Sequence, residues 1–399
     1  MHRSALFGAK ANELDRLRLD TILFDYAHAL PHTPMTTTTP PLVVSPKHQL
    51  LGVTLASGWR LDEVLAATAG SSGSTFGVGY RASRGADEAF VKAIDFWDAL
   101  NAADPIAELS KLSKIALFER DVLEHCKANG MNRVLQFIGH EYVSVGDKSN
   151  PMNRVSCLIM EAGETDLRRL VVVNGLANCA WNLQVIRDVS MAVAQLHRSE
   201  IAHQDLKPSN VIEFGDVLPG GIPDMKVGDL GRVVRKGATG PFDSMPWPGD
   251  RRYSPPERWY GYVPPDWCDA REASDAYMLG SLLFYLFTGT PLQVVIMNAI
   301  PSAFRPGVWT GRYDQDLKPV LVSAHGEVLD THLRPTLMPE VADDVLAIAK
   351  ALTDPVPETR GDNRARRQLG RPVGINRIQQ RIAALAAKCT AIDRGRRRP

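Results

Sequence analysis

The stretch from residue 201 to residue 231, IAHQDLKPSNVIEFGDVLPGGIPDMKVGDLG, constrains this chain more than any other. Asp205 is followed by Lys207 and then by Asn210, and Asp229 lies in a Gly-Asp-Leu-Gly turn. A carboxylate can accept the proton of a hydroxyl, a lysine can neutralise a phosphoryl group, and amide and carboxylate oxygens suit Mg²⁺. Each Asp alone is typical of a turn or a helix cap. Together, at this spacing, the four residues predict phosphoryl transfer.

The same stretch resembles the catalytic and metal-binding loops of eukaryotic-like (Hanks-type) Ser/Thr protein kinases. His203-Gln204-Asp205 stands where that family has His-Arg-Asp, and Asp229-Leu230-Gly231 where it has Asp-Phe-Gly. The resemblance implies ATP as the phosphoryl donor and Mg²⁺ as the metal. It implies these roles: Asp205 as catalytic base, Lys207 beside the transferred phosphoryl group, and Asn210 and Asp229 as metal ligands.

The resemblance covers roughly residues 58–388 and implies an α+β protein with the two-lobed protein-kinase fold. A small β-rich N-lobe with one main helix is expected to precede a larger, mostly helical C-lobe. We place the parts as follows: an N-terminal extension and Pro/Thr-rich linker at 1–50, the N-lobe at 51–163, the C-lobe at 164–372, and a C-terminal helix with a basic tail at 373–399.

Three short strands are predicted after Trp59, the first two joined by a loop of small residues. In the family, a glycine-rich loop at this place covers the nucleotide phosphates. Gly73, Phe76 and Gly77 match that loop near its tip, but serines occupy the first two glycine places of G-x-G-x-x-G. Such a loop alone is typical of a plain hairpin, so it gains meaning only from the motifs that follow.

Lys92, in the predicted third strand, matches the family's lysine that holds the α and β phosphates. An exposed strand lysine is the ordinary alternative, so the assignment requires an acidic partner on a helix. Residues 106–128 have helical apolar periodicity and carry two candidates. We favour Glu119, which precedes an apolar pair as the family's ion-pairing glutamate does, over Glu108.

The lobe junction is expected after a predicted strand that ends at Glu161. By resemblance, Met160 lies at the back of the adenine pocket, and the backbone of Glu161 and Ala162 meets the adenine edge. Asp166 is a candidate partner of the ribose. Because Asp166 also stands at the start of a predicted helix, a role as an N-terminal capping carboxylate stays open.

Three further residues match structural positions of the family. The segment that begins at Asp229 ends in Tyr253-Ser254-Pro255-Pro256-Glu257, where the family has Ala-Pro-Glu. Glu257 is expected to form a buried ion pair with Arg360. Asp275 is expected to tie the start of a buried helix to the backbone of the catalytic loop. This closing motif separates the chain from small-molecule kinases of related fold.

Two residues depart from the family. Gln204 replaces the arginine that usually binds a phosphorylated activation segment. Switching by loop phosphorylation is therefore expected to matter less, although Thr239 and Ser244 are available acceptors. Asp250 stands where Ser/Thr kinases usually carry a threonine that contacts the catalytic Asp and Lys.

Composition narrows the expected partners. Lys plus Arg number 46 and Asp plus Glu 45, so a net charge of +1 creates no global field toward nucleic acid or membrane. Five scattered cysteines without a C-x-x-C pair are typical of reduced thiols in a cytosol. The apolar run within 276–300 breaks after about a dozen residues, short of the ~18 to 20 that a membrane span requires. We expect a soluble cytoplasmic protein with no membrane or nucleic-acid partner.

The remaining sequence predicts a mostly helical C-lobe. Helical periodicity is clear over 181–199, 341–353 and 375–389, and the last range has one apolar face, formed by Ile375, Ile378, Ile382 and Leu385. Residues 298–340 show no clear periodicity and are a candidate docking surface. The chain ends in the basic tail DRGRRRP.

The sequence therefore predicts a Ser/Thr protein kinase that transfers the γ-phosphate of ATP to protein substrates. The first alternative is a pseudokinase scaffold that binds partners without turnover. The serines of the glycine loop, Gln204 and Asp250 favour the scaffold. The retained acidic and basic set favours the enzyme: Lys92, Glu119, Asp205, Asn210 and Asp229. The second alternative, a small-molecule kinase, is disfavoured by the Pro-Pro-Glu closure.

Overall fold

The computed structural model describes residues 44–65, 77–174, 178–215, 223–245, 247, 249–369 and 373–396. The chain divides into two units, Met1–Val44 and Ser45–Pro399, and every element named below belongs to the second. Gly73 and Phe76, two of the predicted nucleotide-loop residues, lie outside the described residues.

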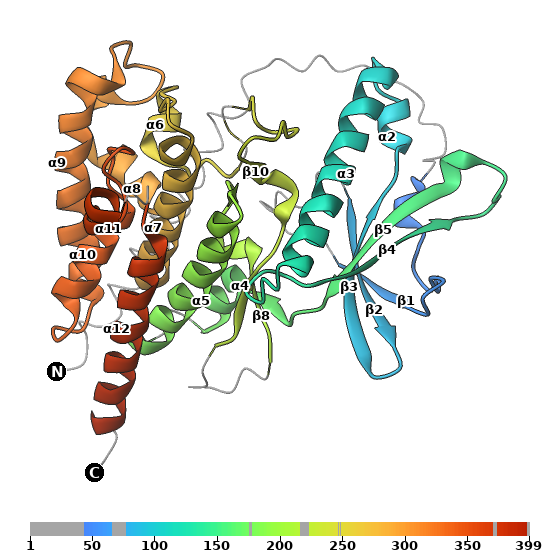
Figure 1. The fold of residues 1–399 in the computed structure, drawn as a ribbon, viewed down its shortest axis with the longest axis horizontal. Coiled ribbons are helices and arrows are strands. Elements are labelled where there is room, and N and C mark those ends of the chain that lie inside the picture. Colours follow the sequence, from blue (N-terminus) through green and yellow to red (C-terminus); the bar gives the residue numbers. More distant parts are fainter. Residues whose placement is uncertain are drawn as a thin grey trace, which may run out of the picture. The chain divides into compact units, whose positions relative to one another are not determined.

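The N-lobe is built on a five-stranded antiparallel sheet with the order β1-β2-β3-β5-β4 (Figure 1). Its strands are β1 (Arg60–Leu65), β2 (Val78–Arg84), β3 (Asp87–Ile94), β4 (Phe137–Ser144) and β5 (Arg154–Glu161). The three strands predicted after Trp59 and the strand predicted to end at Glu161 are confirmed. The alternation of side chains along β3 buries Val91 in the small core of this lobe and turns Lys92 to the opposite face.

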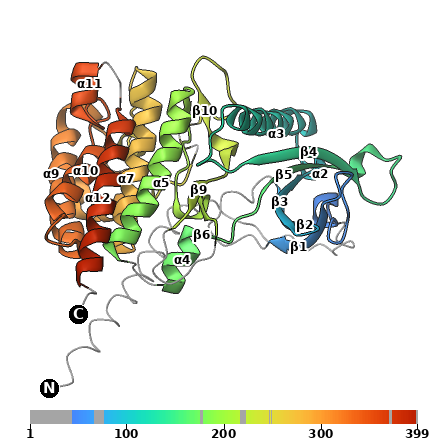
Figure 2. The same cartoon turned by 60° about the horizontal axis from the view of Figure 1, so that its bottom comes forward.

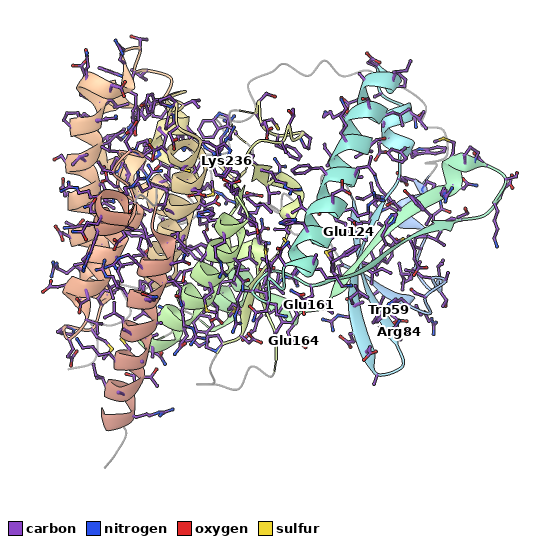
Figure 3. All side chains as sticks on the ribbon, in the orientation of Figure 1. Trp59, Arg84, Glu124, Glu161, Glu164 and Lys236 are labelled. Carbon is purple, nitrogen blue, oxygen red and sulfur yellow. The ribbon has the colours of Figure 1, made fainter. Side chains whose placement is uncertain are left out.

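Residues that precede β1 in the chain cover the outer face of the N-lobe sheet. Trp59 is buried under the guanidinium of Arg84, which lies 4.4 Å from the ring centroid (Figure 3). Leu50 is fully buried in the same small core. The Tyr80 hydroxyl donates to the Lys47 carbonyl at 2.6 Å. These apolar and polar contacts bind Lys47 and Leu50, at the end of the predicted linker, to the sheet.

The main helix of the N-lobe, α3 (Pro105–Ala128), begins with a capped first turn after the short α2 (Trp97–Leu100). The Asp104 carboxylate accepts from the Ala107 amide at 3.0 Å, and Pro105 occupies the first helical position. The residues that α3 buries recur at helical spacing and face the sheet: Ile115, Glu119, Val122, Leu123 and Cys126. The helix predicted over 106–128 is confirmed.

The C-lobe is mostly helical and carries two small sheets. Its helices are α4 (Leu167–Asn174), α5 (Cys179–Arg198), α6 (Pro256–Trp259), α7 (Ala273–Thr288), α8 (Leu292–Ala299), α9 (Lys318–Val328), α10 (Ala342–Leu352), α11 (Asn363–Leu369) and α12 (Ile375–Arg396). Its short strands are β6 (Thr165–Asp166), β7 (Ile201–Ala202), β8 (Val211–Glu213), β9 (Met225–Val227) and β10 (Val234–Arg235). The sheets have the orders β6-β8-β9 and β10-β7.

Helix α7 forms the centre of the C-lobe, since nearly every residue along it is buried. Within the described ranges, no single helix is long and apolar enough to cross a membrane. A bent pair of helices, Cys268–Thr288 with Leu292–Ala299, has the length and the composition of a membrane span, and the resemblance to a span ends there.

Helix α12 lies alongside α5 in both ribbon views (Figures 1 and 2). Its predicted inward face is confirmed, because Ile375, Ile378, Ile382 and Leu385 are all buried. The Sγ atoms of Cys179 and Cys389 approach to 3.2 Å between these two helices.

The expectation of an irregular segment over 298–340 is wrong in part, because α9 lies within it. Leu321, Ala324 and Val328 are buried at helical spacing, and Leu317 is buried in the turn before them. Pro319 and Gly326, which lower helix propensity, obscured this stripe in the sequence. Tertiary packing of the apolar face outweighs that local preference.

We expect Ile382→Ala to lower the free energy of unfolding by about 2–5 kcal/mol, because a fully buried aliphatic side chain is removed. Arg381→Ala, on the exposed side of the same turn, should change it by less than about 0.5 kcal/mol. Urea unfolding of the full chain measures both values. Equal effects of the two substitutions would show that α12 is not packed as described.

Candidate active site

A cleft of about 710 Å³ lies between the inner face of the N-lobe sheet and the C-lobe. Most of the predicted nucleotide and metal residues line it: Gly77, Lys92, Glu119, Met160, Glu161, Ala162, Asp166, Asn210 and Asp229. Gly77 stands where a side chain would not fit, since a Cβ there would approach the Ala93 carbonyl oxygen to 2.9 Å. Asp205 and Lys207 lie deeper, at 1% and 2% exposure.

The partner of Lys92 is Glu119, whose two carboxylate oxygens lie 2.7 and 2.9 Å from the Lys92 Nζ. The preference for Glu119 over Glu108 is confirmed, because Glu108 pairs with Lys111 on the exposed side of α3. Asp229 is a second neighbour, with Oδ1 at 3.9 Å from Nζ. Burial alone would lower the pKa of Lys92, but the carboxylates of Glu119 and Asp229 outweigh it and raise that pKa.

The pairing of β8 with β9 brings Asn210 and Asp229 to the same end of this small sheet. Val211 pairs with Val227, and the Gly228 amide donates to the Asn210 carbonyl at 2.9 Å. Asp229 follows in the left-handed region, at φ +57°. Burial would raise the Asp229 pKa, yet the charges of Lys92 and Lys207 lower it, so the group is held as a carboxylate.

The donor set of these two residues fits Mg²⁺. The side-chain nitrogen of Asn210 donates to the Asp205 carbonyl at 2.8 Å, so the Asn210 Oδ1 points away from that carbonyl. Asp229, which also lines the cleft, supplies a carboxylate. Across the described ranges no group of three or more His, Cys, Asp or Glu side chains could hold a metal. A site with two protein oxygens suits a hard cation whose other ligands are phosphate oxygens and water.

Asp205 is held from two sides. Its Oδ2 accepts from the Lys207 Nζ at 3.0 Å and lies 3.4 Å from the Asn210 amide nitrogen. Its Oδ1 accepts from the Asp250 backbone amide at 2.8 Å. The carboxylate is thus held in a fixed orientation beside Lys207 and Asn210, as a base that receives a hydroxyl proton must be.

The loop that carries Asp205 is anchored to helix α7. The Asp275 carboxylate accepts from the backbone amides of His203 and Gln204 at 2.7 and 2.8 Å, and lies 3.0 Å from the His197 Nε2. Burial would raise the pKa of Asp275, but the His197 contact and the Gln204 amide lower it. The predicted tie between the buried helix and the catalytic loop is confirmed.

Comparison with known proteins agrees with this geometry. A family model described as the protein kinase domain matches residues 103–299. Serine/threonine-protein kinase PrkC of Bacillus subtilis is 29% identical over 33% of this chain and 19% of its own length. A probable serine/threonine-protein kinase PknB of Bifidobacterium longum is 31% identical over 44% of this chain and 24% of its own length. Mitogen-activated protein kinase mpkB of Aspergillus fumigatus is 28% identical over 40% of this chain and 44% of its own length. The matched segments therefore span less than half of each relative.

This chain belongs to the Hanks-type Ser/Thr protein kinase family. Its closing ion pair is present: Arg360 donates from both Nη atoms to the two Glu257 oxygens at 2.8 Å. Both side chains are almost fully buried. Burial would lower the Arg360 pKa, but the charge of Glu257 and its hydrogen bonds raise that pKa, so the guanidinium remains charged. The expected link between the end of the activation segment and the C-lobe is confirmed.

In the kinase hinge, the amide and the carboxylate of Glu161 are bonded within the protein. The Glu161 amide already donates to the Gln136 carbonyl at 3.0 Å, so it cannot also serve the adenine edge. The Glu161 carboxylate accepts from the Gln136 amide at 2.7 Å and from the Lys226 Nζ at 2.6 Å. Glu161 and Glu164 both lie where the sheet meets the C-lobe (Figure 3). Only the amide of Glu161 is engaged in this way, so the contact of the Glu161 and Ala162 backbone with the adenine edge stays a prediction.

Asp166 has the capping role that the sequence left open. Its Oδ1 accepts from the Arg169 amide at 3.0 Å and closes the first turn of α4. The same residue lines the cleft, so a contact with a ribose stays a prediction.

Gln204 is fully buried at φ +64°, and two arginines surround it that the sequence analysis missed. Its amide nitrogen donates to the Arg271 carbonyl at 2.9 Å, and its oxygen accepts from the Arg258 guanidinium. Burial and the nearby Arg271 charge lower the pKa of Arg258 to about 10. The Arg271 guanidinium also donates to the Asp243 carbonyl of the activation segment at 2.7 Å. No motif in the sequence links residues this far apart.

We expect Glu119→Ala to lower the free energy of unfolding by about 3 kcal/mol, because a buried ammonium group loses its main partner. Glu108→Ala removes an exposed pair and should cost less than about 1 kcal/mol. Urea unfolding compares the two single variants. A loss as large for Glu108→Ala would contradict the pairing described above.

Proposed function

We propose that this chain is an active protein kinase that transfers the γ-phosphate of ATP to Ser or Thr hydroxyls of protein substrates. The observation that carries the proposal is the assembled charge arrangement around the cleft. The Lys92 Nζ bonds the Glu119 carboxylate and lies 3.9 Å from the Asp229 Oδ1. The Lys207 Nζ bonds the Asp205 carboxylate at 3.0 Å. Each charged group of the transfer reaction thus has a counter-charge already in place.

The roles follow from what each group can do. ATP with Mg²⁺ supplies the transferable phosphoryl group when bound. Lys92 holds phosphate oxygens in the cleft, and Asn210 and Asp229 offer the two metal ligands. Asp205 orients the acceptor hydroxyl and takes its proton, while Lys207 neutralises the charge that develops beside it.

The Ser/Thr acceptor is supported by the sequence around Lys207 and by the relatives. Asp205-Leu206-Lys207-Pro208-Ser209-Asn210 resembles the loop of Ser/Thr kinases rather than of tyrosine kinases. The bacterial relatives are named as serine/threonine-protein kinases. The protein substrate is supported by the Glu257–Arg360 closure, because this motif separates the chain from small-molecule kinases of related fold.

We also propose a reducing compartment such as the cytoplasm. All five cysteines lie within the described residues as free thiols, each of them buried. Buried unpaired thiols are ordinary in the cytosol and uncommon in secreted proteins.

A pseudokinase scaffold is the second candidate, favoured by Asp250 in the place of threonine and by the serines of the glycine loop. It would bind nucleotide or a partner without turnover. The two candidates differ in whether Asp205 is used chemically, so transfer separates them.

The test is phosphate transfer from labelled ATP with Mg²⁺ to the chain itself and to a generic basic protein. We expect incorporation by the parent, and a loss of about 10²-fold or more in Asp205→Ala and in Asp229→Ala. Asp344→Ala, an exposed residue of α10, is the matched control and should transfer normally. Acid hydrolysis of the product identifies the labelled residue. ATP binding without any transfer would instead establish the scaffold, and phosphotyrosine would overturn the acceptor assignment.

A further inference from the structure

The activation segment passes over the catalytic loop at Gly249. A Cβ at this position would lie 2.4 Å from the Gln204 carbonyl oxygen and 2.7 Å from the Asp205 Oδ1. Contacts under 3.0 Å do not occur for real Cβ atoms, so a larger residue would push the two segments apart. This close crossing brings the Asp250 backbone amide to 2.8 Å from the Asp205 Oδ1.

The crossing also brings a second acidic side chain to the catalytic base. The Asp250 side chain is only 13% exposed, and Lys207, which bonds Asp205, is near enough to lower the pKa of Asp250. Two carboxylates beside one ammonium group would compete for it, and each would disfavour the charge of the other.

Arg252 removes this competition. Its Nε and Nη2 donate to the two Asp250 oxygens at 3.1 and 2.8 Å, and its backbone amide donates to the Asp250 Oδ1 at 2.9 Å. Burial would raise the pKa of Asp250, but these Arg252 contacts outweigh it. The carboxylate is therefore charged and committed to Arg252.

We propose that Arg252 is a positioning residue for the catalytic base: it holds the Asp250 carboxylate away from Lys207, while the Asp250 backbone amide orients Asp205. The inference rests on the proposed kinase function. In this arrangement the backbone amide and the Asp250–Arg252 ion pair together take the place of the family's threonine.

The chemical consequence concerns the proton of the acceptor hydroxyl. In the transfer step this proton moves to Asp205 as the hydroxyl oxygen bonds to phosphorus and the bond to the leaving oxygen of ATP breaks. Without Arg252, the unpaired Asp250 charge would draw the Lys207 ammonium group away from Asp205, and the carboxylate that takes this proton would lose one of the contacts that orient it. Lys207 bonds the Asp205 carboxylate at 3.0 Å, and Arg252 bonds the Asp250 carboxylate at 2.8 Å.

The experiment compares four variants in steady-state transfer to a generic basic protein, with kcat and KM measured separately. Arg252→Gln removes the counter-charge, and Asp250→Asn removes the carboxylate but keeps the backbone amide. The double variant removes both members of the pair. Arg251→Gln removes the same charge from the exposed neighbouring residue, as the matched control.

We expect Arg252→Gln to lower kcat about tenfold or more while the KM for ATP stays within about threefold of the parent's, because Asp205 takes part in the transfer step. Asp250→Asn and the double variant should stay within about threefold of the parent in kcat, because an amide does not compete for Lys207. Arg251→Gln should leave kcat and KM at the parent's values. Rescue by the second substitution distinguishes charge competition from a loss of packing, and thermal unfolding of each variant checks its folding.

Two results would overturn the inference while leaving the kinase intact. One is an Arg252→Gln variant with the parent's kcat. The other is a double variant as impaired as Arg252→Gln alone, which would show that Arg252 acts through other contacts. A parent that transfers no phosphate would overturn the proposed function, and this inference with it.

Discussion

The buried carboxylate of Asp275 is the constraint on which the catalytic machinery depends. It lies in the first turn of α7, which is buried along nearly its whole length, and it accepts hydrogen bonds from the backbone amides of His203 and Gln204. A carboxylate without solvent must be hydrogen-bonded on both oxygens, and these two amides together with His197 provide the bonds. The loop that presents Asp205 is therefore part of the core of the lobe.

The cleft is organised as a set of paired charges with limited contact with water. Lys92 is shared by Glu119 and Asp229, and Lys207 bonds Asp205. Leaving one member of such a pair alone is costly, since its charge would lose both water and its partner. This arrangement explains why an extra carboxylate at residue 250 requires an arginine two residues later.

The residues that depart from the family pattern have hydrogen-bond partners inside this fold. Gln204 bonds the Arg271 carbonyl, and Arg258 donates to its side-chain oxygen. Arg271 also bonds the Asp243 carbonyl, so the activation segment contacts this network through neutral backbone. These contacts account for a stable loop at the position where the family carries an arginine.

The sequence by itself determined the fold family, the order of the elements and the partners of the main charges. Short motifs such as Asp205 to Asn210 specify their chemistry locally, and helical spacing identified Glu119. Only the tertiary structure decided that Glu161 is bonded within the hinge, that Arg258 and Arg271 enclose Gln204, and that Asp250 meets Asp205 through its amide. These contacts join residues distant in sequence, and they depend on where buried polar groups find partners, which no local pattern records.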